Sequence, residues 1–179
     1  MKIIGFIYYQ GGSEMILKGD SCLLNGGKPL FIPEWTKALG ATPCSIIRVS
    51  RMGKEIAPRF AHRYYDAIAP GMDFVAMDIL AQAQSDQRSW TKALAFDYSL
   101  ALGQWMDKEE WASAQKDELF NGRAVISPEE AIAEVSKWMT IRQGDLIYIQ
   151  QAQPPKAVQM DEVITATING EQKLYCKIK

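Results

Sequence analysis

The stretch EVITATI at 162–168, then Asn169-Gly170, then QKLYCKI at 172–178 is the part of the sequence that most clearly specifies structure. Both runs are rich in β-branched and aromatic residues, which favour strands. Asn-Gly is a strong hairpin signal because both residues tolerate positive φ. We therefore expect an antiparallel hairpin here, and further turns between strands at Asn25-Gly26 and Asn121-Gly122.

The remaining β-rich segments predict that strands dominate the chain. They lie at 2–9, 30–32, 44–50, 72–78 and 145–151. Helices and strands do not alternate as βαβ units, which argues against a doubly wound parallel sheet. We expect one α+β domain with mixed sheets over residues 1–179.

Two longer helices and one short helix are predicted. Ile56, Phe60, Tyr64 and Ile68 recur every four residues, which indicates an apolar helical face over 58–69, ended by the dipeptide at 70–71, Pro-Gly. His62 lies opposite that face and should be exposed to solvent. A shorter helix is expected around 108–116.

The other long helix is predicted to begin after Ser127. Ser127 is suited to be its N-cap, Pro128 its first residue, and Glu130 the partner that completes a capping box. Its predicted apolar stripe consists of Ala131, Val135, Trp138 and Met139.

Composition narrows the class of protein. A formal net charge of −1 provides no broad basic field for nucleic acid or an acidic membrane surface. No segment has the roughly 18 apolar residues of a membrane span. Three widely spaced cysteines (Cys22, Cys44, Cys176) argue against a disulfide framework. We expect a cytoplasmic protein.

Taken without a family, the residues suggest no active site. Cys44 and His62 could form a dyad, and with Asp73 a zinc site, but they lack motif spacing, so a buried cysteine and a surface histidine are the simpler interpretation. Asp73 and Asp78, five apart in one predicted strand, should point to opposite faces. An aromatic group could line a pocket, although core or interface packing is the commoner role: Trp90, Phe96, Trp105 and Trp111.

An ordered series of segments nevertheless resembles the short acylpyruvate-hydrolase branch of the fumarylacetoacetate hydrolase family. The series covers almost the whole chain: MKIIGFIYY (1–9), LKGDSCLLNGGKPLFIPEW (17–35), GKEIAPRFAHRYYDAIAPGMDFVAMD (53–78), WTKALAFD (90–97), FNGRAVI (120–126) and RQGDLIYIQQ (142–151). The resemblance implies a mixed β-roll or β-sandwich with flanking helices, commonly dimeric. It also implies hydrolysis, decarboxylation or tautomerisation of 2-oxo or 2,4-diketo acids at Mg²⁺ or Mn²⁺ held by three carboxylates.

Carried over residue by residue, the resemblance leaves that site incomplete. The two glutamates of the family's metal site fall at Thr42 and Cys44, and the third carboxylate is retained as Asp73. The change removes two anionic oxygen donors and introduces a hydroxyl and a soft thiol.

The substrate-binding positions change as well. The family arginine falls at Met77, next to a retained Asp78, and the family lysine falls at Leu94, with Lys92 two residues away. The substrate loop becomes a run that contains Gln150 and Gln151, Lys18 is a remnant of the substrate-side stretch, and the lid after Tyr9 is shortened.

The resemblance therefore implies a member that has lost metal-dependent catalysis and acts as a scaffold or binding protein, with no cofactor. Its partner would be a second copy or an active paralogue. One alternative is an active hydrolase, decarboxylase or tautomerase, using Mg²⁺ or Mn²⁺ if the family activity survives, or else Cys44 as nucleophile or a tautomerisation without metal. A second alternative is a sensor of a small 2-oxo acid.

Overall fold

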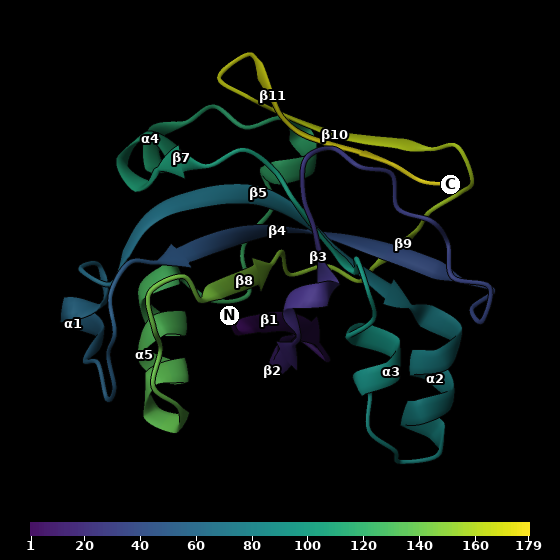
Figure 1. Ribbon diagram of the computed structural model, residues 1–179, viewed down its shortest axis with the longest axis horizontal. Coiled ribbons are helices and arrows are strands. Elements are labelled where there is room, and N and C mark those ends of the chain that lie inside the picture. The colour runs from purple at the N-terminus through teal and green to yellow at the C-terminus, as the bar shows by residue number, and fades with distance from the viewer.

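The computed structural model describes residues 1–179, and its centre is a nine-stranded mixed sheet (Figure 1). The strand order is β2-β1-β8-β4-β5-β6-β3, with β7 also paired to β5 and β9 to β4. Pairs are antiparallel except β1–β8 and β3–β6. The strands are β1 (Ile3–Tyr9), β2 (Gly12–Lys18), β3 (Leu23–Leu24), β4 (Leu39–Val49), β5 (Tyr65–Ala76), β6 (Leu100–Leu102), β7 (Met106–Asp107), β8 (Leu146–Gln150) and β9 (Lys156–Ala157).

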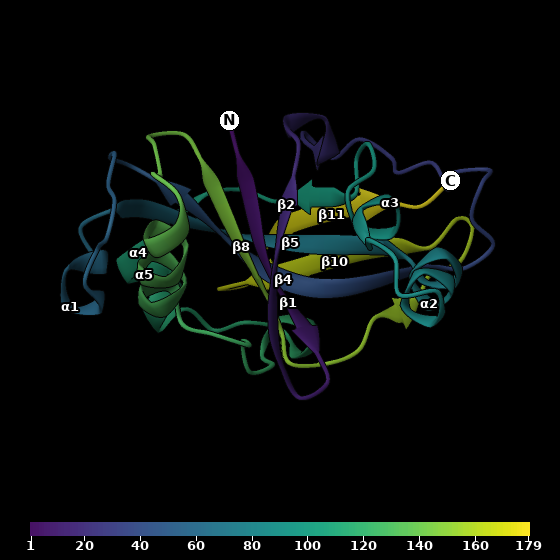
Figure 2. The same ribbon diagram turned by 90° about the horizontal axis from the view of Figure 1, so that it is seen from below.

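The predicted C-terminal hairpin is confirmed, and it forms a two-stranded sheet separate from the large one. Strands β10 (Val163–Ile168) and β11 (Glu171–Lys177) turn at Asn169 and Gly170, whose φ angles are +53° and +79°. Along β10 exposed and buried residues alternate, so one face is apolar. That face covers the large sheet above β4 and β5, where Ile164 and Leu174 pack in one cluster with Phe74 (Figures 1 and 2).

Helices cover other parts of the large sheet. They are α1 (Pro58–Ala61), α2 (Met77–Ser85), α3 (Thr91–Leu94), α4 (Lys108–Ser113) and α5 (Pro128–Trp138), with 3₁₀ turns η1 (Asp20–Cys22) and η2 (Glu118–Phe120). The capping box of α5 is confirmed, since the Glu130 amide donates to Ser127 Oγ and Glu130 accepts from the Ser127 amide. The predicted stripe is wrong at Trp138, which is 69% exposed, whereas Ile132 is buried.

The helix predicted over 58–69 is wrong, because only its first turn forms. The chain leaves α1 at His62 and enters β5, which is buried at eleven of its twelve positions. Of the four spaced apolar residues only Ile68 lies in β5, and pairing of this strand with β4 along its whole length replaces the helix from Tyr65 onward. Pro70-Gly71 therefore lies inside β5 and does not end a helix. Pro70 falls between the segments that pair with β7 and β6, where a strand tolerates proline.

Several predicted strand limits and turns also change. Strand β4 begins five residues earlier than predicted, β5 ends at Ala76 so that Asp78 lies in α2, and only Leu30 of 30–32 makes a bridge. Asn25-Gly26 lies at a turn and Asn121-Gly122 in an irregular segment after η2, and neither connects the strands of a hairpin. The second hairpin is β1–β2, with its turn at Gln10 and Gly11, both at positive φ.

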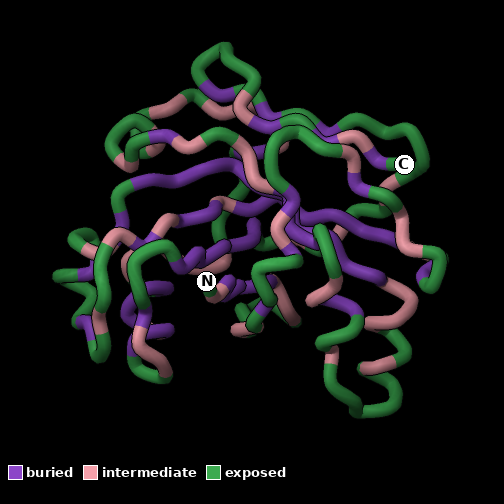
Figure 3. Tube along the Cα trace, in the orientation of Figure 1, coloured by how far each residue is buried: buried purple, intermediate pink, exposed green.

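Buried residues follow the central strands, and alternate residues of each strand serve different clusters (Figure 3). Ile47 and Ile149 pack with α5, whereas Ile46 and Tyr148 pack with Leu94 of α3. The proposed aromatic group is divided among these clusters: Trp90 contacts Tyr9, Phe96 contacts Trp35, Trp105 contacts Arg48 and Trp111 contacts Lys116. None of the helices combines the length and the apolar character that a membrane span requires.

Candidate functional site

The positions assigned to the family's metal site lie side by side on one face of the sheet. Thr42 is directly opposite Asp73 in the β4–β5 pair, and Cys44 is directly opposite Gln150 in the β4–β8 pair. Residues directly opposite one another share a face, as do residues two apart in a strand. The fold therefore gathers all four side chains, and each is buried.

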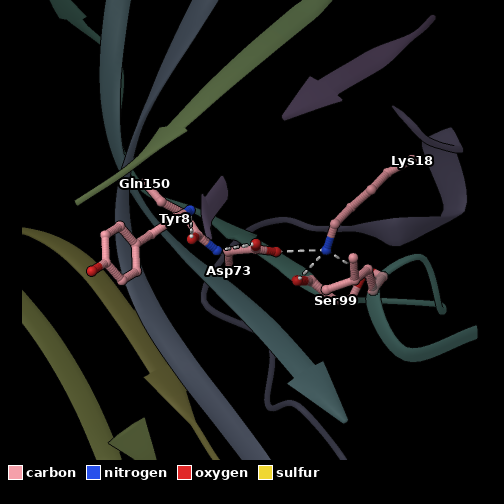
Figure 4. A network of polar contacts seen from close by, with 6 residues as sticks. Tyr8, Lys18, Asp73, Ser99 and Gln150 are labelled. Atoms are coloured by element: carbon pink, nitrogen blue, oxygen red, sulfur yellow. Dashed lines mark hydrogen bonds and ion pairs between the residues drawn. The ribbon is translucent and has the colours of Figure 1, made fainter. Parts of the chain in front are cut away.

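A buried ion pair occupies this face (Figure 4). Lys18, the last residue of β2, places its ammonium Nζ 2.6 Å from Asp73 Oδ1, and the two side chains are 0% and 1% exposed. The ammonium also donates to Ser99 Oγ at 2.9 Å and to the Ser99 carbonyl at 3.1 Å. Its three N–H groups thus have three acceptors.

The second oxygen of Asp73 is engaged by the amide of Gln150. Gln150 Nε2 donates to Asp73 Oδ2 at 2.7 Å, while Gln150 Oε1 accepts from the Tyr8 backbone amide at 2.8 Å (Figure 4). The network joins β1, β2, β5, β8 and the residue before β6. Neither oxygen of the carboxylate is left without a partner from this chain.

Burial sets the protonation of the neighbouring groups. Burial raises the pKa of the Asp73 carboxyl, and the Lys18 ammonium and the Gln150 hydrogen bond oppose that rise. Burial and then the Asp73 charge raise the pKa of the Cys44 thiol well above its ordinary value. Since the thiolate is the nucleophile and the metal ligand, the protonated Cys44 is poorly suited to either role.

Two hydroxyl groups near this carboxylate make no hydrogen bond of ordinary geometry within the chain. They are Thr42 Oγ1 and the Tyr148 hydroxyl, both buried. Burial, and then the Asp73 charge, raises the pKa of Tyr148 well above its ordinary value. The ring fits because Gly5 lies beside it: a Cβ on Gly5 would be 2.2 Å from Tyr148 Cζ.

The donor set does not fit Mg²⁺ or Mn²⁺. These ions prefer several hard oxygen ligands, and Mg²⁺ gives up its water reluctantly. The chain offers one carboxylate with both oxygens engaged, a threonine hydroxyl and a protonated thiol. No group of three His, Cys, Asp or Glu side chains is arranged to hold a metal ion.

The other predicted positions lie around this face without joining the network through their side chains. Leu94 is buried in α3, where its carbonyl accepts from Ser99 Oγ, and Lys92 is exposed, so it does not substitute for the family lysine. Met77 begins α2 and contacts Gly40. Asp78 accepts from Thr36 Oγ1 and from the Lys37 amide. Asp73 and Asp78 thus have separate partners, although the expected reason, opposite faces of one strand, is wrong.

The structure does not favour a catalytic pair of Cys44 and His62. His62 is exposed at the end of α1, as predicted, whereas Cys44 is buried within β4. A cavity of about 200 Å³ does reach Cys44, Ser45, Lys116 and Gln151. Lys116 Nζ donates to the carbonyls of Trp111 and Ala114 and makes no ion pair, and partial burial lowers the pKa of Lys116.

Sequence reasoning named Lys18, Asp73 and Gln150 but missed that they bind one another. It also missed Ser99, Tyr8, Tyr148 and Gly5. Lys18 follows the short apolar run Met15–Leu17, and nothing else near it in the sequence points to its burial. Ser99 is brought to the site by pairing between Asp73 and Leu100. No spacing in the sequence predicts contacts of that separation.

Comparison with known proteins identifies relatives in sequence and in structure. The mitochondrial oxaloacetate tautomerase FAHD1 of Rattus norvegicus is 23% identical over 177 residues, covering 92% of this chain and 80% of that protein. A fumarylacetoacetate hydrolase family protein from Yersinia pestis CO92 superposes with a TM-score of 0.85 at 16% identity, covering 99% of this chain and 92% of the other.

A fumarylpyruvate hydrolase from Pseudomonas aeruginosa, whose structure holds Mn²⁺ and pyruvate, superposes with a TM-score of 0.78 at 18% identity, covering 99% of this chain and 88% of the other. The family model for the fumarylacetoacetate (FAA) hydrolase C-terminal domain matches residues 9–178. Because that match spans nearly the entire sequence, the chain belongs to the fumarylacetoacetate hydrolase family.

Proposed function

We propose that this chain is a member of the family that has lost metal-dependent catalysis and acts as a scaffold or binding protein. The observation that carries the proposal is the engagement of Asp73, the one retained carboxylate, by Lys18 and Gln150. A divalent ion would have to displace a buried ammonium and would gain no other carboxylate. A divalent cation facing a single carboxylate would keep uncompensated positive charge, which is costly in a buried site.

The main alternative is an active hydrolase, decarboxylase or tautomerase, which the names of the relatives favour. The two possibilities separate in one experiment. Purified protein is assayed with acylpyruvates and oxaloacetate in the presence of Mn²⁺, beside the variants Asp73→Ala and Asp66→Ala. Asp66 is the matched control because it lies on β5 but is exposed.

We expect neither turnover above the uncatalysed rate nor saturable Mn²⁺ binding by the wild-type protein. Turnover that Asp73→Ala abolishes and Asp66→Ala preserves would establish an enzyme and end the proposal. Turnover that survives Asp73→Ala would indicate catalysis by other residues, with Cys44→Ser as the next variant.

A second candidate function is the binding of a small 2-oxo acid, favoured by Lys116 in the cavity of about 200 Å³. An ammonium without an ion-pair partner suits a carboxylate. Thermal unfolding is measured with pyruvate, oxaloacetate and acetate. Ligand at 100 times its Kd should stabilise by about 2.7 kcal/mol, and Lys116→Met should remove the effect. No shift with either 2-oxo acid would contradict this candidate.

A scaffold protein requires a binding partner. We propose a homodimer, or a heterodimer with an active paralogue, in the reducing environment of the cytoplasm. All three cysteines, Cys22, Cys44 and Cys176, are buried and unpaired, which suits such an environment. Sedimentation velocity at several concentrations measures the oligomeric state, and a monomer throughout would contradict the homodimer.

A further inference from the structure

We propose that the loop between β4 and β5, residues 51–63, is a docking surface for a membrane that carries anionic phospholipids. The loop is closed where it leaves the sheet, because the Ser50 amide donates to the Tyr64 carbonyl at 2.9 Å. It contains α1 and lies at one end of the molecule, beside α5 (Figures 1 and 2). None of its residues takes part in the hydrogen bonds around Asp73, so this role does not depend on whether the chain is an enzyme.

The loop concentrates positive charge on a chain whose formal net charge is −1. It carries Arg51, Lys54, Arg59 and Arg63 against a single acidic residue, Glu55, and all five are exposed. None of the four cations makes an ion pair. The composition argues against a broad basic field, but a local one is present at this end of the molecule.

Aromatic rings hold three of these cations in place. Two guanidinium groups lie over the ring of Phe60, with Arg59 Cζ 4.7 Å and Arg63 Cζ 5.2 Å from its centroid. Arg51 Cζ lies 6.0 Å from the ring centroid of Tyr64. Such contacts use the charge of the guanidinium and leave its N–H groups free. The one guanidinium that donates a hydrogen bond within the chain belongs to β4, so the donors of these three arginines are available to phosphate oxygens.

Large apolar side chains project among these charges. Met52 and Phe60 are 69% and 39% exposed. Lys54 Nζ donates to the Lys137 carbonyl at 3.0 Å, which places Trp138, exposed at the end of α5, beside the loop. Basic side chains interspersed with aromatic and other large apolar ones are typical of surfaces that bind an anionic bilayer, because the apolar groups enter the boundary between headgroups and acyl chains.

Other partners fit this surface less well. Proteins that bind single-stranded nucleic acid stack bases on open aromatic faces, whereas Phe60 is already stacked with guanidinium groups and Met52 has no ring. A second copy bound through the same surface would bring like charges together across a two-fold axis. A bilayer accepts both the cations and the apolar side chains.

The test measures binding to sucrose-loaded vesicles by sedimentation. One set contains phosphatidylcholine alone, and the other contains equal amounts of phosphatidylcholine and phosphatidylserine. Three variants are compared with the wild type: R59E/R63E, M52S/F60S and K28E/K37E. The last is the matched control, because it reverses two exposed lysines without ion pairs in the segment that leads into β4, at the opposite end of that strand. Circular dichroism checks that each variant is folded.

We expect the wild-type protein and K28E/K37E to bind the phosphatidylserine vesicles and not those of phosphatidylcholine alone. R59E/R63E should bind at least about tenfold more weakly, because two attractive charges become repulsive. M52S/F60S should also lose at least about tenfold in affinity, although its charge is unchanged. No binding by the wild type, equal binding to both sets, or equal losses in R59E/R63E and K28E/K37E would overturn the proposal.

Two further measurements keep the proposal open to refutation if R59E/R63E is not folded. Binding of the wild-type protein to phosphatidylserine vesicles should weaken as NaCl is added, and binding that is independent of salt would overturn the proposal. Fluorescence anisotropy measures binding to a single-stranded oligonucleotide and to polyglutamate. Tighter binding to either polyanion than to the vesicles would also overturn it, by assigning the surface to a soluble partner. None of these outcomes alters the test of metal-dependent activity, so the two proposals fail separately.

Discussion

The Lys18–Asp73 pair shows how a few side chains set the charge of a buried face within the family fold. Both groups are removed from water, so each depends on the other and on Ser99 and Gln150 for compensation. Thr42 and Cys44 beside them are neutral and equally buried. The chemistry of the face therefore follows from which of its positions carry charge.

Replacing Lys18 by methionine should destabilise the fold strongly, because it leaves the Asp73 carboxylate buried without its counter-ion. Breaking a buried pair in this way typically costs about 3–5 kcal/mol. Urea unfolding at neutral pH measures the loss. Lys137→Met is the control: that lysine pairs with Glu134 on an exposed helix surface, and its loss should cost about 0.5 kcal/mol or less. Similar small losses in both variants would show that the Lys18 pair adds little.

Gly5→Ala should also destabilise, for a steric reason. The new Cβ would lie 2.2 Å from Tyr148 Cζ in a packed core, and overpacking of this kind costs about 1–3 kcal/mol. Tyr148→Leu should rescue part of the loss by removing the ring. Gly12→Ala is a suitable control, because its nearest heavy atom would be 3.7 Å away. Absence of rescue in the double variant would argue against this contact.

Among the elements, helix α5 and strand β5 are specified by different kinds of information. The start of α5 is fixed by side-chain hydrogen bonds within four residues, Ser127 to Glu130, which act wherever the helix packs. Strand β5 is fixed by partners on both sides, β4 along its whole length and β6 and β7 along parts of it. A helix cap is therefore visible in sequence, whereas the limits of a long central strand such as β5 depend on its partners.

Ser127→Ala tests the local part of this contrast. The substitution removes the oxygen that accepts from the Glu130 amide, and losses of an N-cap of this type are about 1 kcal/mol. Thermal unfolding should show a lower midpoint, and Ser127→Asp should restore it because aspartate is also a good cap. Ser113→Ala, near the exposed end of α4, should have a smaller effect. An unchanged midpoint for Ser127→Ala would mean that packing alone holds α5.

Across the whole molecule, the sheet connects the first strand to residues near 145. Asp145 accepts from the Lys2 backbone amide at 2.9 Å, the Lys2 ammonium at 2.6 Å and the Arg142 amide at 2.8 Å. Partial burial alone would raise the pKa of Asp145, but these hydrogen bonds and the Lys2 charge lower it below its ordinary value of 3.8. The carboxylate thus ties β1 to the turn that begins β8.

The lowered pKa of Asp145 predicts a contribution to acid sensitivity. A carboxyl with a depressed pKa in the folded state stabilises the fold above its ordinary pKa, and loses that contribution as the pH falls through the folded value. Free energies of unfolding should therefore decline below about pH 4, and Asp145→Asn should decline less steeply over the same range. Urea titrations from pH 7 to pH 2.5 measure both slopes. Parallel curves would mean that Asp145 does not contribute.

The features predicted correctly from the sequence are those set by residues close to one another in the chain. The C-terminal hairpin, the cap of α5, the mixed α+β class and the family were all predicted, because turn residues, capping residues and ordered motifs act over short stretches. The helix over 58–69 is wrong because pairing with β4 makes the chain a strand from Tyr65 onward, and a strand buried on both faces shows no two-residue period in its sequence. The β1–β2 hairpin was not predicted, because no strand was expected at 12–18 and Gln10-Gly11 is not a typical hairpin dipeptide.

Through its resemblance to the family, the sequence by itself predicts that two metal-site carboxylates are missing and that Asp73 is retained, since this requires only residue identity at matched positions. Tertiary structure alone decided what Asp73 contacts. Lys18, Ser99 and Gln150 are separated from it by 55, 26 and 77 positions, and strand pairing brings them within hydrogen-bond distance. Such neighbours stabilise a buried charge, because no water remains to screen or solvate it.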